Sequence, residues 1–147
     1  MRGVKKASDR IYVVVDTNVL VSALLTANSS SSTVQIVELL FKGTLVPLYN
    51  DTIIEEYTEV LGRKKFNFNP MIVSELLSAF MIVGINTEVT KVEDEFFPDQ
   101  DDIVFYEVRM SVEDSYLITG NLKHYPKKPF IVSPAQMIAI LRETELI

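Results

Sequence analysis

The chain has 147 residues, of which 48% are hydrophobic and 23% are charged, and its formal net charge is −6. This length supports one domain with a substantial core and excludes two domains of ordinary size, and the composition is typical of a soluble globular protein. The absence of cysteine excludes a disulfide framework, a thiolate metal site and a cysteine nucleophile, and is compatible with a reducing compartment.

The N-terminal ten residues are basic, beginning Met1-Arg2-Gly3-Val4-Lys5-Lys6. The apolar run that follows, Ile11–Val15, is interrupted by Asp16 and is too short for a signal-peptide core or a membrane span. We therefore expect residues 1–10 to be a poorly ordered basic extension and residues 11–147 to form a single domain. The expected location is cytoplasmic, without membrane association.

Short apolar runs alternate with helical patterns along the chain. The strands are expected at residues 11–15, 45–49, 86–89, 116–119 and 130–132. The helices are expected at residues 19–24, 33–41, 51–61, 71–83, 99–110 and 134–141. Asp51 is a candidate N-cap for the third helix, and Ser133-Pro134-Ala135-Gln136 predicts a capping box for the last.

This alternation predicts an α/β fold in which helices cover both faces of a central, mainly parallel sheet of short strands, a three-layer α/β/α sandwich. Such sheets bind ligands outside the C-terminal ends of their strands. Asp16 lies at such an end, directly after the apolar strand Ile11–Val15. A carboxylate there is costly to bury unless something neutralises it. The alternative, equally weighted on position alone, is that Asp16 caps the next helix.

Two further acids are candidates for the same site. Glu56 lies at the edge of the apolar stripe of its helix, where an isolated glutamate is more often a surface residue. Asp102 lies in the first turn of the helix that begins at Asp99, where the helix dipole also favours negative charge. Residues 93–102 hold six acids and no base, which matches the whole net charge of the chain. This segment is either a solvated loop or a source of cation ligands.

Oxygen ligands of this kind suit Mg²⁺ or Mn²⁺ rather than zinc. The single histidine, His124, cannot supply the histidine-rich ligation that is usual for catalytic zinc.

Four blocks of the sequence resemble the PIN-domain family, in particular its toxin-like bacterial and archaeal branch. They follow the family's order and cover roughly residues 11 to 141. The blocks are Val13–Leu25 with Asp16-Thr17-Asn18, Glu55–Leu61, Asp99–Phe105 and Tyr116–Asn121. The resemblance implies a metal-dependent endoribonuclease on an α/β/α sandwich, often the toxin that is paired with an antitoxin protein.

The resemblance also implies the site. The catalytic, metal-binding acids of the family fall on Asp16, Glu56 and Asp102, with supporting roles for Asn18, Thr119 and Asp99. Asn121 stands where many members carry a fourth acid, so we expect one Mg²⁺ or Mn²⁺ to bind well and a second to bind weakly. Arg109 replaces a usual alanine, and it could neutralise the site, contact phosphate or reach solvent.

The predicted function is hydrolysis of RNA phosphodiester bonds by a metal-activated water. The candidate RNA contacts are Arg63, Lys64, Lys65 and Lys123, with His124 and Tyr125 available for stacking on bases. For Lys127 and Lys128, a role in surface solubility is the favoured interpretation. The alternative function, favoured by Asn121 and Arg109, is a catalytically weakened PIN-fold module that binds RNA or protein. The very apolar helix at 71–83 predicts a homodimer.

Overall fold

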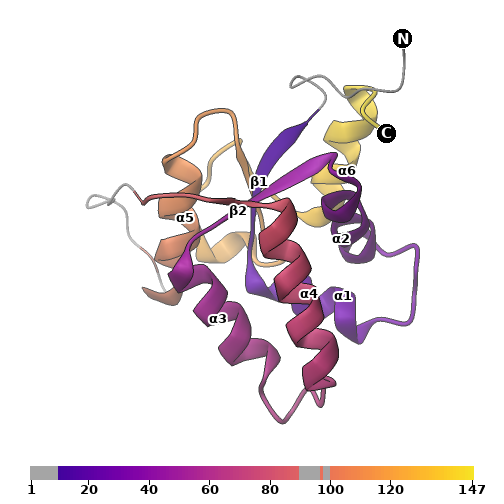
Figure 1. Ribbon diagram of the computed structural model, residues 1–147. Coiled ribbons are helices and arrows are strands. Elements are labelled where there is room, and N and C mark those ends of the chain that lie inside the picture. The colour runs from indigo at the N-terminus through magenta and orange to yellow at the C-terminus, as the bar shows by residue number, and fades with distance from the viewer. Residues whose placement is uncertain (1–9, 90–96, 98–99) are drawn as a thin grey trace.

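The computed structural model describes residues 10–89, 97 and 100–147, and a five-stranded sheet runs through its centre (Figure 1). The strand order is β3-β2-β1-β4-β5, and every neighbouring pair is parallel. The strands are β1 (Ile11–Val15), β2 (Leu45–Tyr49), β3 (Ile85–Asn86), β4 (Tyr116–Ile118) and β5 (Ile131–Val132). The predicted parallel α/β sheet is thereby confirmed.

Helices cover both faces of this sheet. They are α1 (Thr17–Leu25), α2 (Ser32–Lys42), α3 (Asp51–Leu61), α4 (Pro70–Val83), α5 (Ile103–Met110) and α6 (Pro134–Glu143), with short 3-10 helices η2 (Gln100–Asp102) and η3 (Leu122–His124). Helix α2 packs against β2 and α6, whereas α5 packs against β1 and β4. Figure 1 shows α5 on one side of the strands and α2 with α6 on the other. The sheet is therefore the middle layer of an α/β/α arrangement.

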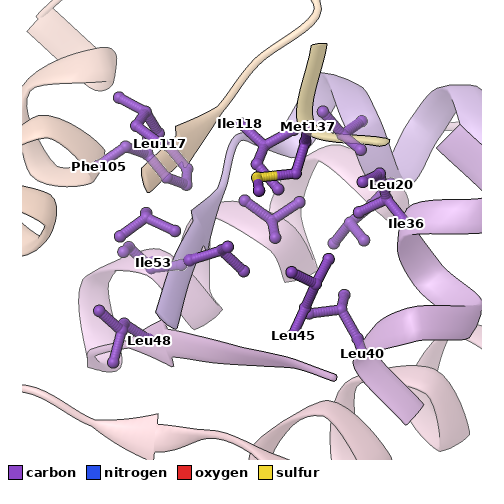
Figure 2. Close-up of a cluster of buried hydrophobic side chains, with 14 of the residues drawn as sticks. Leu20, Ile36, Leu40, Leu45, Leu48, Ile53, Phe105, Leu117, Ile118 and Met137 are labelled. Carbon is purple, nitrogen blue, oxygen red and sulfur yellow. The ribbon is translucent and has the colours of Figure 1, made fainter. Parts of the chain in front are cut away.

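The core explains why the strands are apolar along their whole length. Val13, Val14 and Val15 of β1 are fully buried, because β1 is the middle strand and has a helix layer on each face. Figure 2 shows aliphatic side chains from the strands meeting side chains from helices of both layers, including Phe105 of α5. The labelled members of this cluster are Leu20, Ile36, Leu40, Leu45, Leu48, Ile53, Phe105, Leu117, Ile118 and Met137. This packed core holds the strand ends in fixed positions.

Several element boundaries differ from those expected. Asn50, not Asp51, caps α3, since its Oδ1 accepts a 2.9 Å hydrogen bond from the Ile53 amide. Regular α5 begins at Ile103 after the 3-10 turn, and position 99 lies outside the described residues. Strand β3 is a two-residue edge strand that begins one residue before the expected 86–89. The capping box at Ser133 is confirmed, with both of its hydrogen bonds present.

Residues 1–9 of the expected N-terminal extension lie outside the described part of the chain. Within the described part, no helix has both the length and the apolar character that a membrane crossing requires.

Candidate active site

The C-terminal ends of β1 and β4 meet at the point where the strand order reverses. The chain places β2 and β3 on one side of β1 and then returns to place β4 and β5 on the other. Val15 pairs with Ile118, and the Asp16 amide donates to the Ile118 carbonyl at 2.9 Å. Asp16 and Thr119, the residues that follow, therefore emerge side by side. Open α/β sheets bind their ligands in the crevice at such a reversal.

Several side chains hydrogen-bond to the Asp16 carboxylate at this edge. The Asp16 side chain is buried, and Oδ2 accepts from the Thr119 hydroxyl at 2.8 Å and from the Tyr125 hydroxyl at 2.9 Å. The Asn18 amide nitrogen makes a longer third contact to the same oxygen, at 3.3 Å. Asp16 occupies the N-cap position of α1, but its side chain makes no capping hydrogen bond. Helix capping therefore does not account for where this carboxylate points.

The electrostatics of Asp16 are those of a desolvated acid. Burial raises the pKa of Asp16 above its ordinary value of 3.8, although the hydrogen bonds from Thr119 and Tyr125 oppose that shift. Among the described residues, no lysine or arginine forms an ion pair with this carboxylate. A cation beside Asp16 would offset the cost of burying its charge.

Asp102 is the second carboxylate of the site and is also largely buried. Its Oδ2 lies 3.1 Å from Nδ1 of His124, and Nε2 of the same ring lies 2.9 Å from the Asn121 amide nitrogen. When the Asn121 side-chain nitrogen donates, Nε2 of His124 accepts. In the neutral ring the proton is then on Nδ1, which donates to Asp102. Asp102 holds the N-cap position of α5 without a side-chain capping bond, as Asp16 does in α1. A side-chain capping bond therefore explains the position of neither acid.

Two consecutive residues connect these carboxylates. His124 contacts Asp102, and Tyr125 donates to Asp16. They are brought there by η3, which turns the chain back toward the sheet directly after β4. Neither contact was predicted from the sequence. The available signal was the proximity of His-Tyr to the strand end at Thr119, but a strand end does not reveal which way a short turn directs its side chains.

Asn18 ties the two strand ends together. Its Oδ1 accepts from the Gly120 amide at 2.8 Å, while its nitrogen faces Asp16. A Cβ atom at Gly120 would lie 3.1 Å from that Oδ1, so glycine allows the close approach. Thr119 also makes two contacts. Its hydroxyl donates to Asp16 and accepts from the backbone N–H of Asn121 at 3.0 Å.

Glu56 lies half-buried on α3 and is not assembled with the two aspartates into a ligand group. Within the described ranges, no three Asp, Glu, His or Cys side chains lie close enough together to hold a metal ion. The charges of Glu56 and Asp101 both contribute to raising the pKa of Arg63, after the larger effect of its hydrogen bond to Glu59. The three-acid metal site stays a prediction.

The other residues predicted for RNA contact lie in different surroundings, and Asp99 lies outside the described residues. Arg63 is engaged by Glu59 at 2.8 Å, Lys65 lies over the ring of Phe66, and Lys64 and Lys123 are exposed. The expectation that Tyr125 is available to stack on a base is wrong, because its ring is buried and its hydroxyl is bonded to Asp16.

Arg109 does not reach the carboxylates. Its guanidinium lies 3.7 Å from the centre of the Phe130 ring, a cation–π contact on the far end of α5. Burial there lowers the pKa of Arg109.

The donors at this edge fit a hard divalent cation. Asp16 and Asp102 supply carboxylate oxygens, and Asn121 keeps its amide oxygen when its nitrogen faces His124. Oxygen ligands of this kind select Mg²⁺ or Mn²⁺. The Asp16 carboxylate is buried, and a cation would offset the cost of burying its charge.

A family model for the PIN domain matches residues 12–123, from β1 to η3. The match includes Asp16, Glu56, Asp102 and Asn121. A comparison with curated proteins gave no match. PIN domains are generally nucleases that use divalent metal ions. Because the matched region contains the strand ends and both buried carboxylates, and covers most of the chain, this protein belongs to the PIN-domain family.

Proposed function

We propose that the protein is a metal-dependent endoribonuclease that hydrolyses RNA phosphodiester bonds at the Asp16–Asp102 site. The observation that carries the proposal is the orientation of Asp16. It is buried at the reversal of the strand order, makes no side-chain capping hydrogen bond, and is held by two hydroxyl groups. Placing a carboxylate in this way costs stability, and a bound cation is the simplest compensation.

In the proposed mechanism, Asp16, Asp102 and Glu56 would hold Mg²⁺ or Mn²⁺, with Asn121 as a neutral ligand. When bound, the ion would supply a Lewis acid for the phosphate and lower the pKa of the attacking water. Thr119 and Tyr125 fix the orientation of the Asp16 carboxylate. His124 fixes Asp102 and is itself oriented by Asn121. Such supporting hydrogen bonds are worth about 10–100-fold in metal affinity or activity.

The proposal extends to partners and location. Lys123, next to His124, and the basic run Arg63, Lys64 and Lys65 would contact the RNA backbone. A cytoplasmic toxin role with an antitoxin partner is supported by the sequence resemblance. A homodimer is supported by α4, on which Met71, Ile72 and Ile82 are exposed by 69%, 52% and 83%.

The test is cleavage of a labelled single-stranded RNA by the purified protein with Mg²⁺ or Mn²⁺. We expect Asp16→Asn and Asp102→Asn to lower the rate by about 100-fold or more, and excess EDTA to abolish it. For Glu56→Gln, the matched control is Glu55→Gln, an exposed neighbour on the same helix that should retain parent activity. Parent-rate cleavage by Asp16→Asn, or in saturating EDTA, would reject the proposal.

The second candidate is a catalytically weakened PIN module that binds RNA or protein. Two observations favour it: the uncharged Asn121 at the end of β4, and the lack of a ready three-ligand group in the described residues. Calorimetry with Mn²⁺ separates the two functions. A nuclease requires metal affinity that depends on Asp16, whereas a binding module requires none.

A further inference from the structure

A groove of about 700 Å³ lies between the segment that follows β4 and helix α6. Its size is within the range of about 300–1,000 Å³ that is usual for ligand sites. Its lining is mainly apolar, with Leu122, Ile131 and Ile140 among the contributing residues. Tyr125 lines this groove and also donates its hydroxyl to Asp16. The groove and the candidate active site therefore share a wall.

The groove also lies in a basic region of an acidic protein. Lys123, Lys127 and Lys128 all contribute to its lining. Between Asp114 and Glu143 the sequence contains no acidic residue, although the whole chain has a net charge of −6. An occupant that complements this region carries negative charge. Phosphate groups are the anions that a nucleic acid brings to such lysines.

The apolar lining restricts the kind of nucleic acid. A double helix presents phosphates but keeps its bases stacked inside, so it offers little apolar surface to a groove. An unpaired nucleotide offers both a flat base and a flanking phosphate. Proline, leucine and isoleucine side chains of the lining are suitable for contact with the base. Lys123 and Lys127 also line the groove and are exposed, so they can contact the phosphates.

We infer that this groove binds an unpaired nucleotide of an RNA strand, next to the phosphate that reaches Asp16. The identity of the strand rests on the proposed function, but binding in the groove does not require cleavage. The groove thereby makes the protein selective for single-stranded RNA over a duplex. Lys127 and Lys128, for which a solubility role was favoured from the sequence, become part of a binding surface.

The experiment measures binding without turnover. The full chain in EDTA is titrated onto a fluorescein-labelled oligouridylate of about 12 nucleotides, within the usual site size, and anisotropy is followed at several salt concentrations. The Lys123→Ala/Lys127→Ala double variant removes charge, and Ala139→Trp fills the groove from α6 without changing charge. Lys42→Ala and Ala27→Trp are the matched controls, because both residues are exposed and neither lines the groove.

We expect the double variant to reduce the slope of log K against log salt by about 0.7 for each lysine removed. Ala139→Trp should weaken binding by about fivefold or more at an unchanged slope. Both controls should bind as the parent does, and a duplex of the same length should bind more weakly than the single strand. Thermal unfolding of each variant identifies any loss of the fold, and the lysine variant tests the inference independently of Ala139→Trp.

Equal affinity of the parent and both groove variants would overturn the inference, as would equal affinity for the duplex. Tighter binding of an oligoglutamate peptide, lost with the same substitutions, would also overturn it and assign the groove to an acidic peptide. Cleavage separates this inference from the proposed function. A protein that binds RNA through the groove but never cleaves it rejects only the nuclease, whereas cleavage that is insensitive to the groove variants rejects only the groove.

Discussion

Asp16 is a residue at which folding and the proposed chemistry have opposite requirements. Burial raises the pKa of its carboxyl above 3.8, so the folded protein binds this proton more tightly than the unfolded chain does. The stability that this provides is fully present below pH 3.8 and is lost as the pH rises through the higher folded-state pKa. At pH values above that folded-state pKa, the metal-free protein therefore contains a buried charge that destabilises it.

Replacing Asp16 by asparagine should consequently stabilise the metal-free protein near neutral pH. The amide oxygen still accepts hydrogen bonds from the Thr119 and Tyr125 hydroxyl groups, but the buried charge is gone. We expect the Tm of Asp16→Asn in EDTA to exceed that of the parent at pH 7.5, and the difference to shrink as the pH falls toward 4. Glu55→Gln, an exposed control, should show no such trend. A lower Tm for Asp16→Asn at pH 7.5 would contradict this account.

Substitutions at Thr119 separate the contribution of its hydroxyl group to stability from the contribution of its side-chain shape. Thr119→Val removes the 2.8 Å hydrogen bond to Asp16 and the hydroxyl that accepts from the backbone N–H of Asn121. Thr119→Ser keeps both hydrogen bonds. Because hydrogen bonds to charged groups contribute about 1.5–3 kcal/mol, we expect the valine variant to lose about that much free energy of unfolding at pH 7. The serine variant should lose clearly less. Urea titrations of both proteins measure the difference, and equal losses would show that the hydroxyl contributes little.

At the scale of elements, the junction of α4 and β3 is fixed by close backbone contact. A Cβ atom at Gly84 would lie 2.6 Å from the carbonyl oxygen of Pro47 in β2 and 2.9 Å from that of Phe80. Neither backbone oxygen can move without disturbing β2 or the end of α4. We expect Gly84→Ala to lower the free energy of unfolding by about 1–3 kcal/mol, as overpacking does. The control Ser78→Ala, on the exposed face of α4, should change it by no more than about 0.5 kcal/mol.

The elements themselves could be predicted from sequence because their signals are local. The alternating apolar runs and helical patterns predicted the strands and α-helices to within a few residues. The sequence that begins at Ser133 predicted the capping box. The boundaries that differed depend on non-local facts. Asn50 and Asp51 are equally good caps by composition, and only the extended backbone at Asn50 decides between them. Strand β3 pairs with Leu48 and Tyr49, the last two residues of β2, so this ladder ends where β2 ends.

The site was only partly predictable for a related reason. Asp16 and Thr119 were predicted because strand ends in a parallel sheet converge, whereas Asn18 was predicted from the family resemblance. The hydrogen bond from Tyr125 to Asp16 spans 109 positions and depends on the direction of one 3-10 turn, for which the sequence carries no periodic signal. The position of Glu56 was predicted from a helical wheel, which gives the face of α3 but not the distance from that face to β1.

At the scale of the whole molecule, the strand order links stability to ligand binding. Residues that follow the first and fourth strands and the residue Asp102 before α5 come together only when β1 and β4 are paired in the folded chain. A cation that binds at this edge therefore binds the folded chain and not the unfolded one. Such selective binding raises the free energy of unfolding by an amount that depends on ligand concentration, about 2.7 kcal/mol at 100 times Kd.

This linkage predicts a saturable rise in the Tm of the parent as Mn²⁺ is added at constant ionic strength. Asp16→Asn and Asp102→Asn each remove a proposed ligand oxygen and its charge, so their Tm should stay nearly flat over the same titration. Glu55→Gln should follow the parent, because an exposed glutamate on the outer face of α3 contributes only weak, screened attraction. If Asp16→Asn gained as much stability from Mn²⁺ as the parent does, the ion would be binding elsewhere, and the buried carboxylate at the end of β1 would need another explanation.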